Sequence, residues 1–264
     1  MKNREESVQI NKYISNAGYC SRREADNYVE QGRVTINNEP ALPTSRVYPG
    51  DTVTVDGERI KLKQNKQHVY LAFHKPQGIT STTDPTDKSN IVSFINYPKR
   101  IFPIGRLDKD SEGLILLTDN GDIVNKILRA GNEHDKEYVV TVNKPITPEF
   151  VRRMAAGLPI LGTRTKPCVV KQEGPKRFKI ILTQGLNRQI RRMCEYLEYE
   201  VISLKRIRIM HITLANIPVG KWRHLSFTEV EALNKALAQS VKTQEASVAK
   251  RPAPKSGKPK QKRP

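Results

Sequence analysis

A polar stretch, KLKQNKQH at residues 61–68, divides the chain into two parts with different patterns of hydrophobic residues. Short amphipathic and alternating segments precede it. From residue 69 onward, longer apolar runs are mixed with helical segments in no regular order. A stretch of this composition is typical of a linker. We therefore predict an α+β protein with a small module at residues 8–60, a linker at 61–68 and a larger domain at 69–240.

The N-terminal part has the pattern of two helices followed by a strand hairpin. INKYISNAG is amphipathic and ends at Gly18, which suits a left-handed C-cap. Ser21 and Glu24 have capping-box spacing for a second helix that runs to Gly32. RVTINNEPA and DTVTVDGERI alternate as strands do. Basic residues gather around these segments and predict an RNA-binding surface, although such charge is usually only a solvated face: Lys12, Arg22, Arg23 and Arg33.

The larger part predicts a mixed, largely antiparallel sheet with helices packed on it. Its strand patterns are VYLAFHKP, GLILLT, EYVVTVNKP, RFKIILTQG and VISLKRIRIMHITL. Its helical patterns are GDIVNKILRAG, TPEFVRRMAAG, NRQIRRMCEYL and TEVEALNKALAQ. We expect Thr147 to cap the second of these helices, and Thr228 with Glu231 to form a capping box for the last.

The charge of the chain points to a polyanionic partner. There are 46 Lys and Arg against 27 Asp and Glu, a formal net charge of +19. Nucleic acid is the commonest partner of such a protein, and binding would depend on salt. Residues 241–264 are rich in Pro, Lys and Ala with few apolar residues, which predicts a disordered basic tail. Three distant cysteines without a CxxC pattern, and no long apolar run, favour a cytoplasmic protein without a membrane segment.

An acidic cluster interrupts this basic chain at GRLDKDSEGLILLTDNGD. Its spacing is close to that of an EF-hand calcium loop, with glycine at the sixth position. However, RIFPIGRL before it contains Pro103 and Gly105, which break an entering helix, and GLILLT after it reads as a strand. We therefore disfavour a calcium site and predict no metal.

The five acids are expected to play different parts. Asp110, Glu112 and Asp119 fit a solvated turn, and Asp122 is placed to cap the helix that follows. Asp108 differs because it follows an arginine by two positions at the start of a glycine-bounded strand. A carboxylate held ionised in a basic RNA-facing surface suits a nucleophile or a base.

Two resemblances cover the whole chain except its tail. INKYISNAGYCSRREADNYVEQGRVTINN resembles the alpha-L RNA-binding module first known from a small-subunit ribosomal protein, with Ile10 where an arginine is common. GRLDKDSEGLILLTDNGD is similar to the signature of pseudouridine synthases of the RsuA/RluB/RluE/RluF family. HKPQGITSTT, KEYVVTV and QGLNRQIRRMCEYLEYEV match further motifs in the family's order.

The resemblance implies a role for individual residues. Asp108 matches the catalytic aspartate, Tyr138 the active-site tyrosine, and Leu182 an apolar position under the base. Arg188 is expected to pair with Asp108 and keep it ionised. Arg106, on the same side of an extended segment, is expected to help flip the nucleotide or to fill the space it leaves, with a structural salt bridge as the alternative. Arg191 and Arg192 would contact RNA phosphates or form a plain basic surface.

The family isomerises uridine in RNA to pseudouridine without a cofactor, and the sequence contains no GxGxxG, GxxxxGK[ST] or HExxH motif. The overall likeness implies a uridine in 23S ribosomal RNA as substrate. The same likeness leaves open whether the anticodon loop of tyrosine tRNA (tRNA-Tyr) is a second substrate. We expect a monomer. The alternative from another class is a non-catalytic RNA-binding or ribosome-assembly protein, against which the intact GRLD, KEY and NRQIRR motifs argue.

Overall fold

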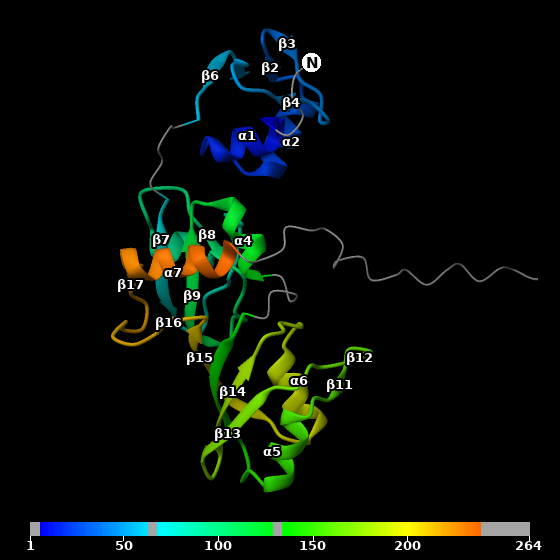
Figure 1. Ribbon diagram of the computed structural model, residues 1–264, viewed down its shortest axis with the longest axis vertical. Helices are drawn as coiled ribbons and strands as arrows, with labels where there is room; N and C mark the ends of the chain where they lie inside the picture. The colour runs from blue at the N-terminus through cyan, green and yellow to red at the C-terminus, as the bar shows by residue number, and fades with distance from the viewer. Residues whose placement is uncertain (1–5, 63–67, 129–133, 239–264) are drawn as a thin grey trace, which may run out of the picture.

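The computed structural model describes residues 6–62, 68–128 and 134–238. Most of the predicted linker (63–67) and the whole predicted tail (241–264) lie outside these ranges. Figure 1 shows the N-terminal module at one end of an elongated molecule and the larger domain below it. Within the described ranges, no helix has the length and hydrophobicity needed to span a bilayer.

The N-terminal module packs two helices on short strands. Its elements are β1 (Val8–Gln9), α1 (Ile10–Asn16), α2 (Arg22–Glu30), β2 (Val34–Ile36), β3 (Glu39–Pro40), β4 (Arg46–Val47), β5 (Val53–Val55) and β6 (Glu58–Ile60). The strands form a four-stranded sheet in the order β3-β2-β5-β6 and a separate β1–β4 pair. Ile10 and Ile14 of α1 are fully buried against Val34, Val53 and Val55.

The predicted capping box of the second helix is confirmed. The Ser21 Oγ accepts from the Glu24 amide at 3.1 Å, and the Glu24 carboxylate accepts from the Ser21 amide at 2.7 Å. This reciprocal pair satisfies two amide groups that the first turn of a helix leaves free. Gly18 (φ +86°) and Gly32 (φ +70°) follow the two helices in the left-handed region, as expected of glycines after a helix.

The larger domain alternates strands and helices irregularly, as predicted. Its strands are β7 (Tyr70–Lys75), β8 (Phe102–Ile104), β9 (Glu112–Thr118), β10 (Lys136–Val142), β11 (Pro159–Ile160), β12 (Thr163–Arg164), β13 (Val169–Gly174), β14 (Arg177–Leu182), β15 (Val201–Ile209), β16 (Ile212–Thr213) and β17 (Trp222–His224). Its helices are α3 (Ile91–Ile95), α4 (Gly121–Leu128), α5 (Pro148–Ala155), α6 (Gln189–Tyr196) and α7 (Phe227–Ala238).

Nine of these strands form one mixed sheet, in the order β13-β14-β10-β15-β9-β7-β17 with β16 beside β15 and β8 beside β9. All pairs are antiparallel except β9–β15, which joins the two halves of the sheet through two residue pairs. At this junction Gly113 (φ +120°) faces Arg206, and a Cβ there would lie 2.2 Å from the Arg206 carbonyl oxygen. Glycine is therefore required for the two strands to meet.

The two halves of the sheet carry separate cores. On the β13-β14-β10-β15 half, α5 and α6 bury Phe150, Met154 and Met193. On the β9-β7 half, alternate residues face opposite sides, so α4 and α7 cover one face and α3 the other. Figure 1 shows these two lobes meeting at the middle of the sheet. The junction between the lobes positions the site described below.

Two helix starts differ from the sequence predictions. The capping box of α7 is formed by Ser226 and Glu229, whose amide-to-side-chain bonds are 2.8 and 3.2 Å, rather than by Thr228 and Glu231. The first turn of α4 is capped by Asn120, whose side chain accepts from the Asp122 amide at 3.1 Å. Asp122 instead pairs with Lys12 of the N-terminal module at 2.5 Å.

Candidate active site

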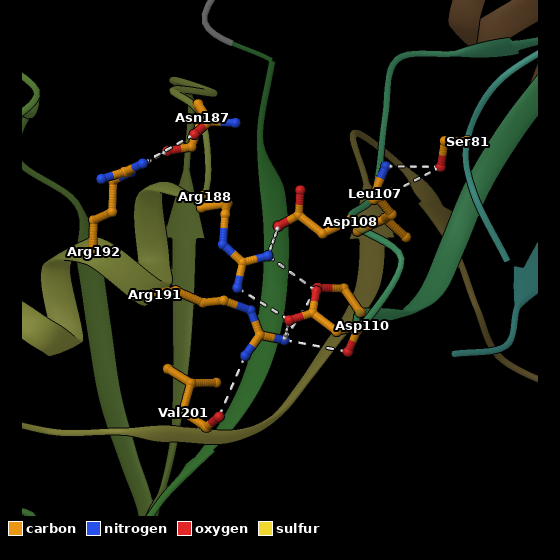
Figure 2. Close-up of polar contacts among 10 residues, drawn as sticks. Ser81, Leu107, Asp108, Asp110, Asn187, Arg188, Arg191, Arg192 and Val201 are labelled. Atoms are coloured by element: carbon orange, nitrogen blue, oxygen red, sulfur yellow. Dashed lines mark hydrogen bonds and ion pairs between the residues drawn. The ribbon is translucent and has the colours of Figure 1, made fainter. Parts of the chain in front are cut away.

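A cleft of about 460 Å³ lies between the two lobes. Residues from the end of β8, from β10, from the β14–α6 loop, from α6 and from β15 line it. The cleft brings together most of the residues that the sequence singled out in the larger domain: Arg106, Asp108, Tyr138, Leu182, Arg188 and Arg191. Arg192, the remaining one, lies outside the lining and donates to the Asn187 carbonyl at 3.2 Å (Figure 2).

The loop that carries Asp108 is fixed by hydrogen bonds on both sides. Ser81 donates its hydroxyl to the Leu107 carbonyl at 2.8 Å and accepts from the Leu107 amide at 3.1 Å (Figure 2). The Ser111 amide donates to the Asp108 carbonyl at 3.0 Å. The Asp108 side chain remains 33% exposed, so a substrate can reach a carboxylate whose backbone cannot shift freely.

Arg188 lines the cleft and lies between two carboxylates, as Figure 2 shows. Its guanidinium donates to Asp110 at 3.1 and 3.2 Å and lies 3.5 Å from Asp108. The predicted pairing with Asp108 is therefore shared with Asp110, which receives the closer contacts. Arg188 itself has φ +49°, a left-handed conformation uncommon for a residue with a side chain, directly before α6.

Asp110 lies in an exposed turn, as expected, but it is more than a solvated residue because two arginines contact its carboxylate. Besides Arg188, Arg191 contacts the Asp110 carboxylate at 3.2 Å. Burial raises the pKa of Asp110, but the two guanidinium groups outweigh it and the net pKa lies below its usual range. Arg191 also donates to the Asp110 carbonyl and to that of Val201, so this side chain, 15% exposed, joins the acidic loop to β15.

The other acids predicted to be solvated are paired as well. Glu112 contacts His74 and Lys205, each at 2.9 Å. Asp119 is nearly buried and accepts from the Val69 amide at 3.0 Å. The loop at 105–111 runs between strands β8 and β9, and not between two helices as an EF-hand requires. Among the described residues, no group of three or more His, Cys, Asp or Glu side chains could hold a metal ion.

Arg206 is a site residue that sequence reasoning missed. It is 4% exposed at the floor of the cleft and donates to the Leu114 carbonyl at 2.7 Å and the Arg106 carbonyl at 3.4 Å. Its Nη2 atom is buried without a hydrogen-bond partner in the described ranges. Its guanidinium carbon lies 5.9 Å from the centre of the Tyr138 ring. The sequence signal that could have identified it is an arginine in a strand at a position that alternates with buried apolar residues.

Two lysines near the cleft are partly desolvated. Burial, with the nearby charge of Arg206, lowers the pKa of Lys136 in the cleft wall to about 8. Burial also lowers the pKa of Lys75 to about 8. The Lys75 ammonium donates to the carbonyls of Pro76 and Ile79, so it supports the turn after β7. His74 is likewise buried, with bonds to Glu112 and the Ile217 carbonyl.

The basic residues predicted on the N-terminal module fall into two groups. Arg22 and Arg23 are exposed, and neither side chain has a partner among residues 6–62, 68–128 and 134–238. Arg33 is also exposed but pairs with Asp56 at 2.6 Å and lies over the Tyr28 ring at 4.2 Å. Lys12 pairs with Asp122, as described above. RNA contact by these residues stays a prediction.

Both parts of the chain match known protein families. A family model described as RNA pseudouridylate synthase matches residues 69–196, and an S4 domain model matches residues 9–53. The chain is 58% identical over 234 residues to the dual-specificity RNA pseudouridine synthase RluF of Escherichia coli K12, covering 89% of this chain and 81% of that protein.

More distant relatives are also pseudouridine synthases. The ribosomal large subunit pseudouridine synthase B of Bacillus subtilis is 34% identical over 239 residues, covering 87% of this chain and 96% of that protein. A crystal structure of a pseudouridylate synthase superposes with a TM-score of 0.64 at 27% identity, covering 86% and 99% of the two chains.

Proposed function

Because the chain belongs to the RNA pseudouridine synthases, an S4 domain followed by a synthase domain, we propose that Asp108 acts on the ribose of a uridine in 23S ribosomal RNA. One observation carries the proposal. Asp108 lies on a rigid loop at the wall of the cleft, accessible and 3.5 Å from the Arg188 guanidinium. An enzyme that isomerises RNA needs an ionised carboxylate in this kind of position.

The reaction breaks the bond between ribose C1′ and uracil N1 and forms one between C1′ and C5. The proton at C5 is lost, N1 gains a proton, and no electron is exchanged with another molecule. Asp108 either attacks C1′ or removes a proton from the neighbouring sugar carbon. Both routes need the carboxylate ionised, and the Arg188 guanidinium lies 3.5 Å from it.

The cleft offers complementary surfaces for the base. The Tyr138 ring and Leu182 line it and suit stacking and packing against uracil. The Tyr138 hydroxyl is proposed to assist removal of the C5 proton. The buried Nη2 of Arg206 is a donor that an acceptor of the bound nucleotide would satisfy.

The target uridine must leave its base stack to enter this cleft. Arg106 lies at the edge of the cleft with an exposed side chain. Its guanidinium has no partner in the described part of the chain, which speaks against the alternative of a structural salt bridge. We assign Arg106 to occupy the space that the flipped nucleotide vacates.

The choice of RNA rests on the relatives. The E. coli relative is named as a dual-specificity enzyme and the B. subtilis relative as acting on the large ribosomal subunit. A 23S ribosomal RNA uridine as main substrate and the anticodon loop of tyrosine tRNA as a second substrate fit these names. The N-terminal module, with exposed Arg22 and Arg23, is proposed to supply affinity and orientation.

The test uses 23S ribosomal RNA transcribed with tritium at uracil C5. Purified protein should release tritium into water, because forming the new bond expels the C5 hydrogen, and release should saturate at one site. Transcribed tyrosine tRNA is the second RNA. Release from neither RNA would overturn the substrate assignment, and release by Asp108→Asn at the wild-type rate would overturn the catalytic role.

A further inference from the structure

A second hollow adjoins the cleft at Arg106. Its volume is about 620 Å³, and it shares Gly105, Arg106 and Leu128 with the cleft. Its remaining walls come from the 80–87 loop and from Phe102 and Pro103 of β8. The roles proposed above leave this second hollow without a function.

The partition between the two cavities is held in place from both sides. The Arg106 carbonyl accepts from Arg206, and Leu107 is bonded twice to Ser81 of the loop that lines the second hollow. Gly105 has φ +85°, and a Cβ there would lie 2.7 Å from the Leu128 side chain. The backbone of this partition is therefore fixed, while the Arg106 side chain projects from it without a partner in the described ranges.

The walls of the second hollow suit a nucleobase better than a phosphate. Half-buried Phe102 and Pro103, with exposed Leu128, give it an apolar side. The carboxylates of Asp84 and Asp87 line the opposite loop and would repel a phosphate.

Hydroxyl groups complete the loop side of the hollow. Thr82 accepts from the Asp84 amide, which leaves its own proton to donate, and the Thr83 side chain has no hydrogen bond within the described residues. The carboxylates accept hydrogen bonds only, and this favours a base that carries an exocyclic amino group.

We propose that the second hollow binds the unpaired base next to the target uridine in the RNA, with Arg106 between the two bases. This inference rests on the proposed function and adds a second base-binding subsite to it. The neighbouring base stacks on Phe102 and presents its amino group to the 82–87 loop. Adenine, guanine and cytosine fit this arrangement, and uracil, which has no exocyclic amino group, fits it less well.

The test starts from the shortest 23S ribosomal RNA hairpin that the wild-type protein converts. Each nucleotide adjacent to the target is replaced in turn by an abasic site or by uridine. One of the two positions should lose about tenfold in kcat/KM when abasic, within the range of one base stacked on an aromatic ring. Uridine there should lose less than the abasic site.

Variants of the hollow identify where that base binds. Phe102→Leu keeps apolar bulk without the flat ring, and Thr83→Val keeps shape without the hydroxyl. Each should lower kcat/KM on the intact hairpin by about three- to tenfold, and Phe102→Leu should cause no further loss on the abasic RNA. Phe227→Leu, on an exposed phenylalanine of α7, is the matched control and should match wild type.

Three outcomes would overturn the subsite. If abasic replacement on either side of the target leaves kcat/KM unchanged, no neighbouring base is bound. If the losses in kcat/KM from Phe102→Leu and from the abasic site multiply when combined, the neighbouring base does not contact Phe102. Unchanged kinetics of both variants, at unchanged melting temperature, show that the hollow is not used. In all three the wild-type hairpin is still converted, whereas failure on that RNA would overturn the proposed function instead.

Discussion

The arginines of the N-terminal module and those of the cleft contrast sharply in their surroundings. Arg22 and Arg23 project from the start of α2 and have no partner among the described residues. Arg188, Arg191 and Arg206 instead contact carboxylates and backbone carbonyls at 2.7–3.5 Å. The same residue type is used in two ways: free charge gives affinity that salt screens, and paired charge gives fixed geometry.

The largest change in rate is expected from a substitution of Asp108 in the cleft. Asp108→Asn keeps the size of the side chain but removes the carboxylate, so the rate of pseudouridine formation should fall by about 10⁴-fold or more. Binding of 23S ribosomal RNA should stay within about twofold. Measured by tritium release and filter binding, a loss of binding as large as the loss of rate would contradict a catalytic role.

Substitutions of Arg188 and Asp110 should have smaller effects on kcat, and they distinguish a residue that acts in catalysis from one that positions Arg188. Arg188→Lys keeps charge but loses the planar two-point contact, and kcat should fall by about 100-fold. Asp110→Asn should lower kcat by about tenfold with KM little changed, because Arg188 loses its closer partner.

A double-mutant cycle provides the control for Asp110. If Asp110 acts through Arg188, adding Asp110→Asn to Arg188→Lys should cost little further. A full tenfold loss in that background would show that Asp110 acts on the RNA or on the fold instead.

A smaller effect is expected on the module. Arg22→Ala with Arg23→Ala should weaken RNA binding by about tenfold at moderate salt and reduce the slope of log affinity against log salt by about 2. The saturated rate should not change. Deleting residues 1–60 should lower both affinity and slope further. If the double variant keeps the wild-type slope of log affinity against log salt, the RNA does not contact Arg22 and Arg23.

A further effect concerns how the stability of the folded protein changes with pH. Lys136 has a pKa of about 8 in the folded protein, below its usual 10.5. The unfolded chain therefore binds more protons between these values, and stability should rise with pH from about 8 to 10.5, by at most about 1.4 kcal/mol per pH unit from this group.

Denaturant unfolding of two variants checks this effect. Lys136→Met should flatten the rise across the window, whereas Lys171→Met, on the exposed strand β13, should leave it unchanged. Identical pH profiles for wild type and Lys136→Met would contradict a desolvated lysine.

Local signals predicted the fold where the partners are close in the chain. Ser21 and Glu24 lie three residues apart and form the expected capping box. The same logic failed at α7, because Ser226 with Glu229 offers the same spacing as Thr228 with Glu231. There Arg223 of β17 pairs with Glu229 at 2.7 Å and favours the earlier start. A tertiary contact decided between two equal local patterns.

The sequence predicted which residues form the site but not which of them form ion pairs with one another. The motifs identified Asp108, Tyr138 and Arg188, and the cleft contains all three. That Asp110 takes the closer contact with Arg188, and Glu112 a contact with Lys205, depends on sheet register and on how the loop before α6 meets the loop before β9. Arg206 was missed for the same reason, because its neighbour Gly113 lies 93 positions away in the chain.

The decisive experiment for the role of Asp108 is a pseudouridine map of 23S ribosomal RNA and tRNA from cells lacking this protein. The cells are complemented with wild type or with Asp108→Asn. We expect that one 23S uridine loses its modification and that only wild type restores it. Restoration by Asp108→Asn, or a map in which no 23S site changes, would contradict the assignment.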